Sequence, residues 1–169
     1  MVERHDVVVV GARCAGAPLA TFLARAGLSV ALVDRATFPS DTPSTHVFQA
    51  SGVAVLGRLG VVDRLLAAGA PWLEMAEFRI DDVHARLPWP TRPGDPGPGL
   101  CVRRPVLDTI LVEAATAAGV AVRTGVRVTG TVDAGGRVAG VTATTAPGHA
   151  AGGGDGEEVR FEAPLVVGA

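Results

Sequence analysis

A short segment near the amino terminus has the residue types and spacing that bind a diphosphate. Between an apolar run and a helical pattern, the G-x-G-x-x-G motif is represented by Gly11, Ala12, Arg13, Cys14, Ala15 and Gly16. Gly11 permits a tight turn, and Gly16 permits a helix to approach the preceding strand closely. Backbone N–H groups and the positive end of the helix dipole then meet at the turn, where an anion binds.

Arg13 occupies the place of the motif's middle glycine, which normally lets the phosphate approach the backbone. An arginine can compensate because it offers its own charge to the phosphate, provided that its side chain folds aside. A glycine pattern this degenerate is also compatible with a purely structural turn in a doubly wound protein. The motif by itself therefore leaves both interpretations open.

Asp34 favours the nucleotide interpretation over the structural one. It follows Gly16 at about the 20-residue distance expected for an acid that accepts hydrogen bonds from a ribose. A carboxylate at this point disfavours a 2′-phosphate, because like charges repel. The predicted nucleotide-binding site therefore suits FAD or NAD better than NADP.

These residues are positioned by a predicted β-α-β unit. Residues 6–10 and 29–33 are short β-branched runs, typical of strands buried on both faces of a parallel sheet. Residues 14–25 between them have apolar side chains at helical spacing, with Pro18 in the first turns and Gly27 after the end. The unit predicts an α/β fold.

Weaker patterns further along the chain predict additional helices, hairpins and loops. Helices are expected within residues 49–68, where two meet near Gly60, and at 105–118. Hairpins are expected from 78–80 with 83–87 and from 126–132 with 138–144. The other expected segments are loops at 35–45 and 88–99, a low-complexity linker at 145–156, and strands at 120–123, 159–162 and 165–167.

Composition excludes several classes of function. The chain has 169 residues, 48% hydrophobic and 19% charged, and no apolar run reaches the roughly 18 residues of a membrane span. A net charge of −2 with scattered arginines offers no nucleic-acid surface. Cys14 and Cys101 are too few for a disulfide framework or a zinc site, and the amino terminus lacks a secretory signal. We expect a cytoplasmic protein without a bound metal, and the sequence gives no indication of its oligomeric state.

Three stretches of the sequence carry a family resemblance. Residues 6–65 (DVVVVGARCAGAPLATFLARAGLSVALVDRATFPSDTPSTHVFQASGVAVLGRLGVVDRL) resemble the opening of FAD-dependent monooxygenases of the p-hydroxybenzoate hydroxylase type and their geranylgeranyl-reductase-like relatives. The resemblance resumes at 101–130 (CVRRPVLDTILVEAATAAGVAVRTGVRVTG) and ends at 163–169 (APLVVGA), which in the family continues into an Asp-Gly motif. It covers nearly all of this chain but under half of a typical family member.

The resemblance implies a set of cofactor-binding residues. The residues of the turn, Gly11 to Gly16, would bind the pyrophosphate of FAD, and Asp34 with Arg35 its adenosine. The remaining implied contacts are Thr45 and His46 near the flavin, Arg103 or Arg104 at the pyrophosphate or ribityl chain, and Val126 or Arg127 at the adenine.

The resemblance also implies a fold and an activity. The fold would be an incomplete Rossmann-like FAD-binding domain over residues 1–169, a parallel sheet with a β-meander crossover, in which 71–102 begin an antiparallel substrate-binding sheet. The parent enzyme would accept hydride from NAD(P)H and use the flavin to hydroxylate a small organic or aromatic substrate, with no catalytic acid or base required from this chain. The alternatives are a flavin-dependent reductase, an NAD-binding dehydrogenase module, and an inactive nucleotide-binding remnant.

Several side chains have two interpretations. Cys14 could be a reactive thiol at a helix start, but a small residue beneath the phosphate is favoured because no histidine or second cysteine is near it in sequence. His46 suits a flavin neighbour or proton carrier, and equally a polar residue that caps the following helix. Trp72 and Trp89 suit edge packing at least as well as a substrate pocket.

Overall fold

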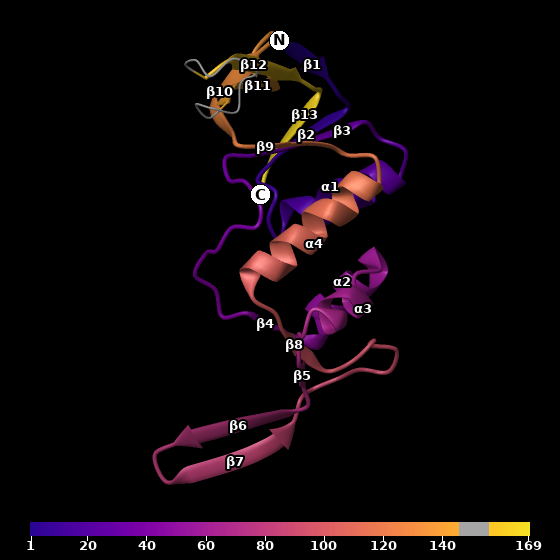
Figure 1. The fold of residues 1–169 in the computed structure, drawn as a ribbon, viewed down its shortest axis with the longest axis vertical. Helices are drawn as coiled ribbons and strands as arrows, with labels where there is room; N and C mark the ends of the chain where they lie inside the picture. The colour runs from indigo at the N-terminus through magenta and orange to yellow at the C-terminus, as the bar shows by residue number, and fades with distance from the viewer. Residues whose placement is uncertain (146–155) are drawn as a thin grey trace. The chain divides into compact units, whose positions relative to one another are not determined.

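The computed structural model describes residues 1–145 and 156–169, so most of the predicted linker at 145–156 lies outside the described residues. The described chain forms two compact units, Met1–Ser40 with Leu111–Ala169 (unit 1) and Asp41–Ile110 (unit 2). Figure 1 labels the elements of both units along the chain. No helix in the described residues is long and apolar enough to cross a membrane.

Unit 1 is built on a four-stranded parallel sheet. Its strand order is β13 (Leu165–Gly168), β2 (Val7–Val10), β3 (Val30–Asp34) and β9 (Ala121–Thr124). Val8, Val9 and Leu32 are fully buried, as expected for β-branched and apolar runs covered on both faces. The predicted parallel sheet is confirmed. The first and last residues of each strand lie within one or two residues of the predicted ones.

Helix α1 (Gly16–Arg25) connects β2 to β3 and packs against both strands. It begins two residues later than the sequence pattern predicts, because the chain first has to turn away from the strand through residues 11–15. Pro18 lies in its first turn, where a missing N–H is harmless. The helix buries small residues, Ala17 and Ala20, against the sheet, which keeps its start close to the end of β2.

A second sheet in unit 1 covers part of the first. Its order is β1 (Val2–Arg4), β12 (Glu158–Glu162), β11 (Val138–Thr145) and β10 (Val126–Asp133), and the last three form an antiparallel meander. Phe161, Val141 and Val126 from this meander pack in one core with Val8 and Val33 of the parallel sheet. The meander lies in sequence between β9 and β13, so the predicted β-meander crossover is confirmed.

Unit 2 combines two short helices with small antiparallel sheets. Helix α2 (Ala50–Leu59) ends at Gly60, which has φ +77°, and α3 (Val62–Ala67) follows. Strands β4 (Val47–Phe48), β8 (Gly99–Cys101) and β5 (Trp72–Leu73) form one sheet, and β6 (Met75–Ile80) with β7 (Val83–Pro88) forms a hairpin. The expected helix pair and hairpin are thus present. Helix α4 (Arg104–Ala117) continues from unit 2 into unit 1.

The region around residues 88–99, expected as an exposed loop, is more ordered at its ends. The hairpin extends to Pro88, and β8 already begins at the buried Gly99. A Cβ at Gly99 would meet the Trp89 ring, and one at Gly97 would meet the Trp72 ring. The Trp72 ring therefore lies against the Gly97 backbone, and the Trp89 ring lies against the Gly99 backbone.

Candidate functional site

The turn between β2 and α1 depends on two glycines. Gly11 has φ +109°, and a side chain there would collide with the Ala169 carbonyl at the end of β13. A side chain at Gly16 would collide with the Gly11 carbonyl. The first glycine thus lets the turn form, and the second brings the helix start against it. This is the spatial role that the sequence pattern assigned to each.

The backbone N–H groups of the turn divide into two sets. Gly11 N–H donates to the Val33 carbonyl (2.8 Å) and Ala12 N–H to the Asp34 carboxylate (2.7 Å). Within the described residues the N–H groups of Cys14, Ala15 and Gly16 have no acceptor, α1 has no side-chain cap, and its first turn holds no acid. Cys14 and Ala15 are exposed. Unsatisfied donors at a helix start form a site for an anion.

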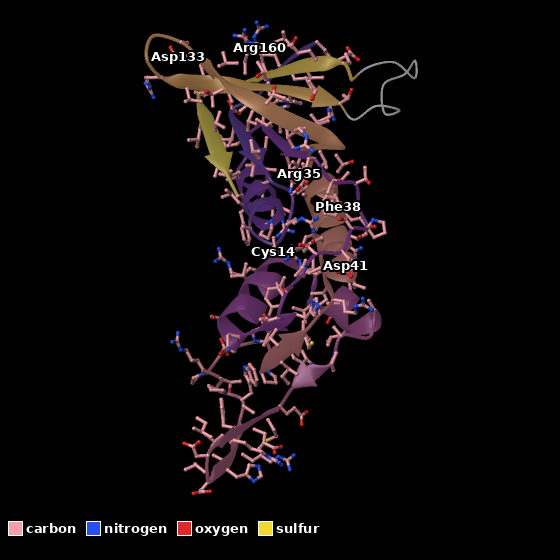
Figure 2. All side chains as sticks on the ribbon, turned by 90° about the vertical axis from the view of Figure 1, so that its left-hand side faces the viewer. Cys14, Arg35, Phe38, Asp41, Asp133 and Arg160 are labelled. Carbon is pink, nitrogen blue, oxygen red and sulfur yellow. The ribbon has the colours of Figure 1, made fainter. Side chains whose placement is uncertain are left out.

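Arg13 is folded to the side of the turn. Its guanidinium lies over the Phe38 ring, 5.5 Å from the centroid, and its Nη2 donates to the Ser40 hydroxyl at 3.1 Å. Figure 2 labels Phe38 and Cys14, the neighbour of Arg13 in the turn. The charge stays beside the turn while the backbone of Cys14 and Ala15 stays exposed, which is the arrangement that an arginine at this position requires.

Asp34 ends β3 with its carboxylate already oriented. Its side chain is largely buried; Oδ2 accepts the Ala12 N–H at 2.7 Å and Oδ1 accepts the Ala36 N–H at 2.8 Å. A carboxylate has about four lone-pair sites, so each oxygen can accept a further hydrogen bond. The acid therefore fastens β3 to the turn and can still accept from a ligand's hydroxyl groups.

A cavity of about 360 Å³ opens beside Asp34. It lies at the carboxyl ends of β2 and β3, where open α/β sheets bind their ligands. Six of the expected site residues line it: Gly11, Arg13, Asp34, Arg35, Val126 and Arg127. Its other lining residues, which sequence reasoning missed, are Val10, Val33, Val128 and Ala169. Val10 and Val33 could have been inferred from their place at the strand ends.

Eight expected residues do not line this cavity. Four of them, Ala12, Cys14, Ala15 and Gly16, belong to the turn beside it, and the other four, Thr45, His46, Arg103 and Arg104, belong to unit 2. The two adjacent arginines differ in their surroundings. Arg104 forms three hydrogen bonds to the fully buried Asp108: Nε donates to Oδ1 at 3.1 Å and to Oδ2 at 3.2 Å, and Nη2 donates to Oδ2 at 3.1 Å. Arg103 has a side chain that is 75% exposed and lies 3.6 Å from Asp41. Of the two, only Arg103 presents its guanidinium to solvent.

His46 has an unusual backbone and an unpaired ring nitrogen. Its φ is +60°, its N–H donates to the Ser44 hydroxyl (3.1 Å), and its carbonyl accepts from Val102 N–H (2.7 Å). Nδ1 is buried without a hydrogen-bond partner in the described residues. The helix that follows has Gln49 as its N-cap, without a side-chain cap, so the interpretation of His46 as a helix cap is wrong. Thr45, the other expected residue here, is exposed.

The described residues contain no cluster of three or more histidine, cysteine or acidic side chains that could hold a metal ion. The polar groups near the 360 Å³ cavity are backbone N–H groups, arginines and one carboxylate. Such a set suits an organic ligand that carries both phosphates and hydroxyl groups.

Comparison with known proteins places this geometry in a family. A family model described as "FAD binding domain" matches residues 4–169. The menaquinone reductase of Mycolicibacterium smegmatis is 37% identical over 143 residues, which are 82% of this chain and 33% of that protein. The chain thus spans about a third of the length of this curated relative.

Solved structures agree with this match. The myxobacterial chondrochloren halogenase CndH, a FAD-dependent halogenase, superposes with a TM-score of 0.85 at 26% identity, over 99% of this chain and 37% of that one. A geranylgeranyl bacteriochlorophyll reductase-like protein from Thermoplasma acidophilum superposes with a TM-score of 0.79 over 100% of this chain and 40% of that one. Because its identity is 20%, the second likeness concerns the fold alone.

Proposed function

The chain belongs to the FAD binding domain family of flavin-dependent oxidoreductases, and on this premise we propose that unit 1 binds the ADP half of FAD in the cavity beside Asp34. The observation that carries the proposal is the Asp34–Ala12 hydrogen bond of 2.7 Å. This bond holds the Asp34 carboxylate, which can accept hydrogen bonds from a ribose, beside the turn. The N–H groups of Cys14, Ala15 and Gly16 in that turn have no acceptor within the described residues.

The residues present fit a diphosphate. The turn places the N–H groups of Cys14, Ala15 and Gly16 at the start of α1, and the absence of Cβ atoms at Gly11 and Gly16 lets the turn stay tight. A diphosphate needs positive charge, which the helix dipole and the Arg13 guanidinium supply. We therefore propose that Gly11 to Gly16 hold the pyrophosphate, with Cys14 as a small packing residue beneath it.

The rest of the cavity fits an adenosine. Asp34 can accept hydrogen bonds from both ribose hydroxyls, and Val126, Val128 and Arg127 from β10 form the wall beyond it. Apolar side chains and a guanidinium plane are suitable surfaces for the faces of an adenine ring. We assign this wall to the adenine and Arg35 to the polar edge of the same pocket.

FAD, when bound, supplies two-electron redox chemistry, while this chain binds and orients it. We propose that the whole protein takes electrons from NAD(P)H and hydroxylates a small organic or aromatic molecule. Reduction of a substrate double bond is the second candidate, favoured by the 37% identity to a menaquinone reductase. Oxygen consumption in step with NAD(P)H oxidation, measured on the whole protein with substrate, supports hydroxylation; oxidation without oxygen uptake supports reduction.

We further propose that residues of unit 2 serve the flavin and substrate side of the enzyme. Arg103 is the arginine of its pair that is exposed enough to contact a ligand, and His46 holds a buried acceptor or donor in a strained backbone. Thr45 belongs to the same loop. Arg104 has a structural role instead, since its guanidinium is paired with the buried Asp108 carboxylate.

Segment 71–102 is proposed to begin the substrate-binding sheet. In the β6–β7 hairpin, Phe78 lies opposite Ala85, and Ile80 lies opposite Val83. These pairs share one face because side chains alternate along a strand. Phe78, Ile80 and Val83 are all more than half exposed, so this apolar face has room for a further layer or an apolar ligand.

Two finer proposals concern the surroundings of the protein. The two cysteines are free thiols, which suits a reducing cytoplasm. Arg13, Arg35 and Arg127 line a cavity of small-molecule size. We therefore propose that the partners are small molecules and that the protein does not bind nucleic acid.

Equilibrium dialysis of residues 1–169 against FAD and against NAD⁺ tests the proposed function. Retention of FAD in preference to NAD⁺ supports a flavin domain. Preference for NAD⁺ would support a dehydrogenase module, and no binding of either at high micromolar concentration would support an inactive remnant.

A further inference from the structure

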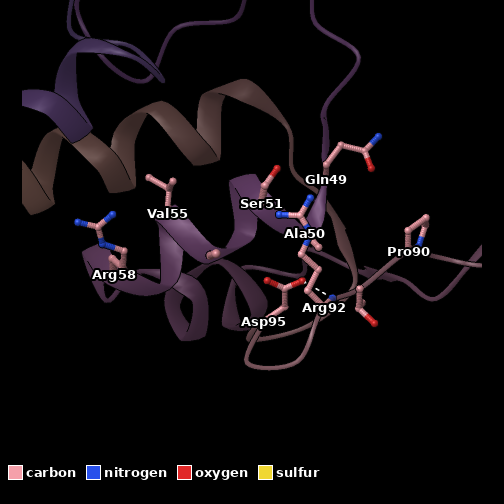
Figure 3. Close-up of a pocket in the computed structure, with 10 residues that line it drawn as sticks. Gln49, Ala50, Ser51, Val55, Arg58, Pro90, Arg92 and Asp95 are labelled. Carbon is pink, nitrogen blue, oxygen red and sulfur yellow. Dashed lines mark hydrogen bonds between the residues drawn. The ribbon is translucent and has the colours of Figure 1, made fainter.

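The Arg13 side chain is held by two residues that lie outside the cavity beside Asp34. The guanidinium lies over the Phe38 ring, with Cζ 5.5 Å from the ring centroid, and its Nη2 donates to the Ser40 hydroxyl at 3.1 Å. Arg13 lines that cavity, whereas Phe38 and Ser40 do not. They are also absent from the lining of a cavity of about 570 Å³ in unit 2, between α2 and the loop after β7 (Figure 3). Phe38 and Ser40 can therefore act on a ligand beside Asp34 through Arg13.

The loop that carries these two partners is anchored where it begins. The Asp34 carboxylate accepts the Ala36 N–H through Oδ1 at 2.8 Å, and the Ala36 carbonyl accepts the Gly125 N–H at 3.1 Å. The other oxygen of the same carboxylate accepts the N–H of Ala12, the residue before Arg13. One largely buried acid thus fixes both the turn that carries the arginine and the loop that carries its partners.

The two contacts restrain the guanidinium in different ways. Arg13, Phe38 and Ser40 are all half-buried. A cation above an aromatic ring is attracted by the negative face of the ring, more strongly where water is partly excluded. A hydroxyl that accepts from a guanidinium fixes the direction of its planar set of donors. Together they hold in one place a side chain that would otherwise sample many rotamers.

This restraint has two consequences for an anion at the turn. The backbone at Cys14 and Ala15 stays exposed, because the guanidinium is held to the side and does not cover it. The positive charge is also in place before a ligand arrives. Binding then does not have to order a long flexible side chain, and affinity rises when that entropic cost is absent.

We propose that Phe38 and Ser40 are positioning residues for the diphosphate of the cofactor: they hold Arg13 where its charge attracts the diphosphate, and they do not touch the ligand themselves. The inference rests on the proposed function, since it needs a diphosphate at the turn. Phe38 supplies the ring that supports the guanidinium, and Ser40 sets the direction in which the guanidinium points. The loop at 35–40 is therefore part of the nucleotide site.

Fluorescence titration of the full chain with FAD tests the proposal in the variants Phe38→Leu and Phe38→Tyr. Phe38→Leu keeps an apolar side chain but removes the aromatic face, and we expect it to weaken FAD binding about twofold to tenfold at low salt. The loss should shrink at high salt, because screening weakens the contribution of the Arg13 charge in both proteins. Phe38→Tyr keeps the aromatic face and should bind as the wild type does. A loss that is the same at both salt concentrations, or the same for the two substitutions, would indicate a merely structural role and overturn the proposal.

A double-substitution cycle with Arg13→Gln separates an effect through Arg13 from any other effect. If Phe38 acts through Arg13, Phe38→Leu should cost no further affinity once Arg13→Gln is present. Ser40→Ala should behave in the same way, and Ser40→Thr, which keeps the hydroxyl, should retain binding. Additive losses in both cycles would overturn the proposal, and the Ser40 cycle decides the matter if Phe38→Leu does not fold.

Phe22→Leu is the matched control, because Phe22 of α1 is also half-buried in unit 1 and does not line the cavity beside Asp34. It should leave the FAD affinity and its salt dependence unchanged, and a loss equal to that of Phe38→Leu would contradict the proposal. A wild-type protein that binds no FAD would overturn the proposed function together with this inference. If the wild type binds FAD and both Phe38→Leu and Ser40→Ala bind it equally well, this inference alone is overturned.

Discussion

The Asp34 carboxylate at the end of β3 accepts the backbone N–H of Ala12 in the turn after β2, at 2.7 Å and out of contact with most solvent. This one bond joins the two strand ends between which the cofactor cavity opens. It explains why an acid is needed here before any ligand arrives: a buried N–H without an acceptor costs about 1–3 kcal/mol. The same carboxylate is thereby oriented for the ribose.

Gly16→Ala should destabilise unit 1. The new Cβ would collide with the Gly11 carbonyl, so the turn or the helix start has to move. We expect a loss of about 1–3 kcal/mol in the free energy of unfolding, measured by urea denaturation. Gly168→Ala is the control, because a Cβ there meets nothing within 4 Å. Equal stability of the two variants would show that the helix does not press on the turn as described.

Asp108→Asn should destabilise the chain far more than Asp41→Asn. Asp108 is fully buried against Arg104, whose side chain is 12% exposed, so its neutralisation leaves a nearly buried charge unpaired. We expect a loss of about 3–5 kcal/mol in the free energy of unfolding. Asp41 and Arg103 form an exposed pair, for which about 0–1 kcal/mol is expected. If urea denaturation gave similar losses in the free energy of unfolding for the two variants, Arg104 could not be assigned a structural role distinct from that of the exposed Arg103.

Arg13→Gln should weaken FAD binding about tenfold and reduce its dependence on salt. The Arg13 guanidinium, held between Phe38 and Ser40, brings positive charge to the side of the proposed phosphate site. Fluorescence titration with FAD at low and high salt measures both effects. Arg4→Gln, which removes an exposed arginine outside the cavity, should change neither quantity. An unaltered salt dependence for Arg13→Gln would exclude the proposed contact.

ADP-ribose should compete with FAD more strongly than its 2′-phosphorylated form. A 2′-phosphate would have to lie against the Asp34 carboxylate, where like charges repel and both ribose hydrogen bonds cannot form. We expect at least about a tenfold difference in the competing concentrations, measured by displacement of bound FAD. Equal competition would place the ribose away from Asp34.

Much of unit 1 could be predicted because its signals are local. The runs of valine in β2 and β3 and the glycines between them each reflect one short segment, and Asp34 adds the acid at the expected strand end. Strands β4 and β5 were not predicted because each has two residues and exists only through pairing across the chain, as between Trp72 and Leu100.

The same distinction, between signals carried by one short segment and contacts made across the chain, applies to the site residues. Arg13 could be named from its place in the motif, but its partners Phe38 and Ser40 could not, because the loop that holds them has no periodicity. The motif alone does not distinguish Arg103 from Arg104. The i, i+4 spacing of Arg104 and Asp108 was a usable signal, since it places both side chains on one face of a helix.

The most direct test of the FAD site is the dissociation constant of FAD for Asp34→Ala, measured by fluorescence titration beside Asp6→Ala. Asp6 also accepts a backbone N–H, from Ser29 at 2.8 Å, but lies outside the cavity, so it controls for the loss of a backbone acceptor. With folding verified by circular dichroism, we expect Asp34→Ala to weaken binding by about 1–3 kcal/mol, or roughly 5-fold to 150-fold, and Asp6→Ala to leave it unchanged. Unchanged FAD affinity in a folded Asp34→Ala protein would contradict the account.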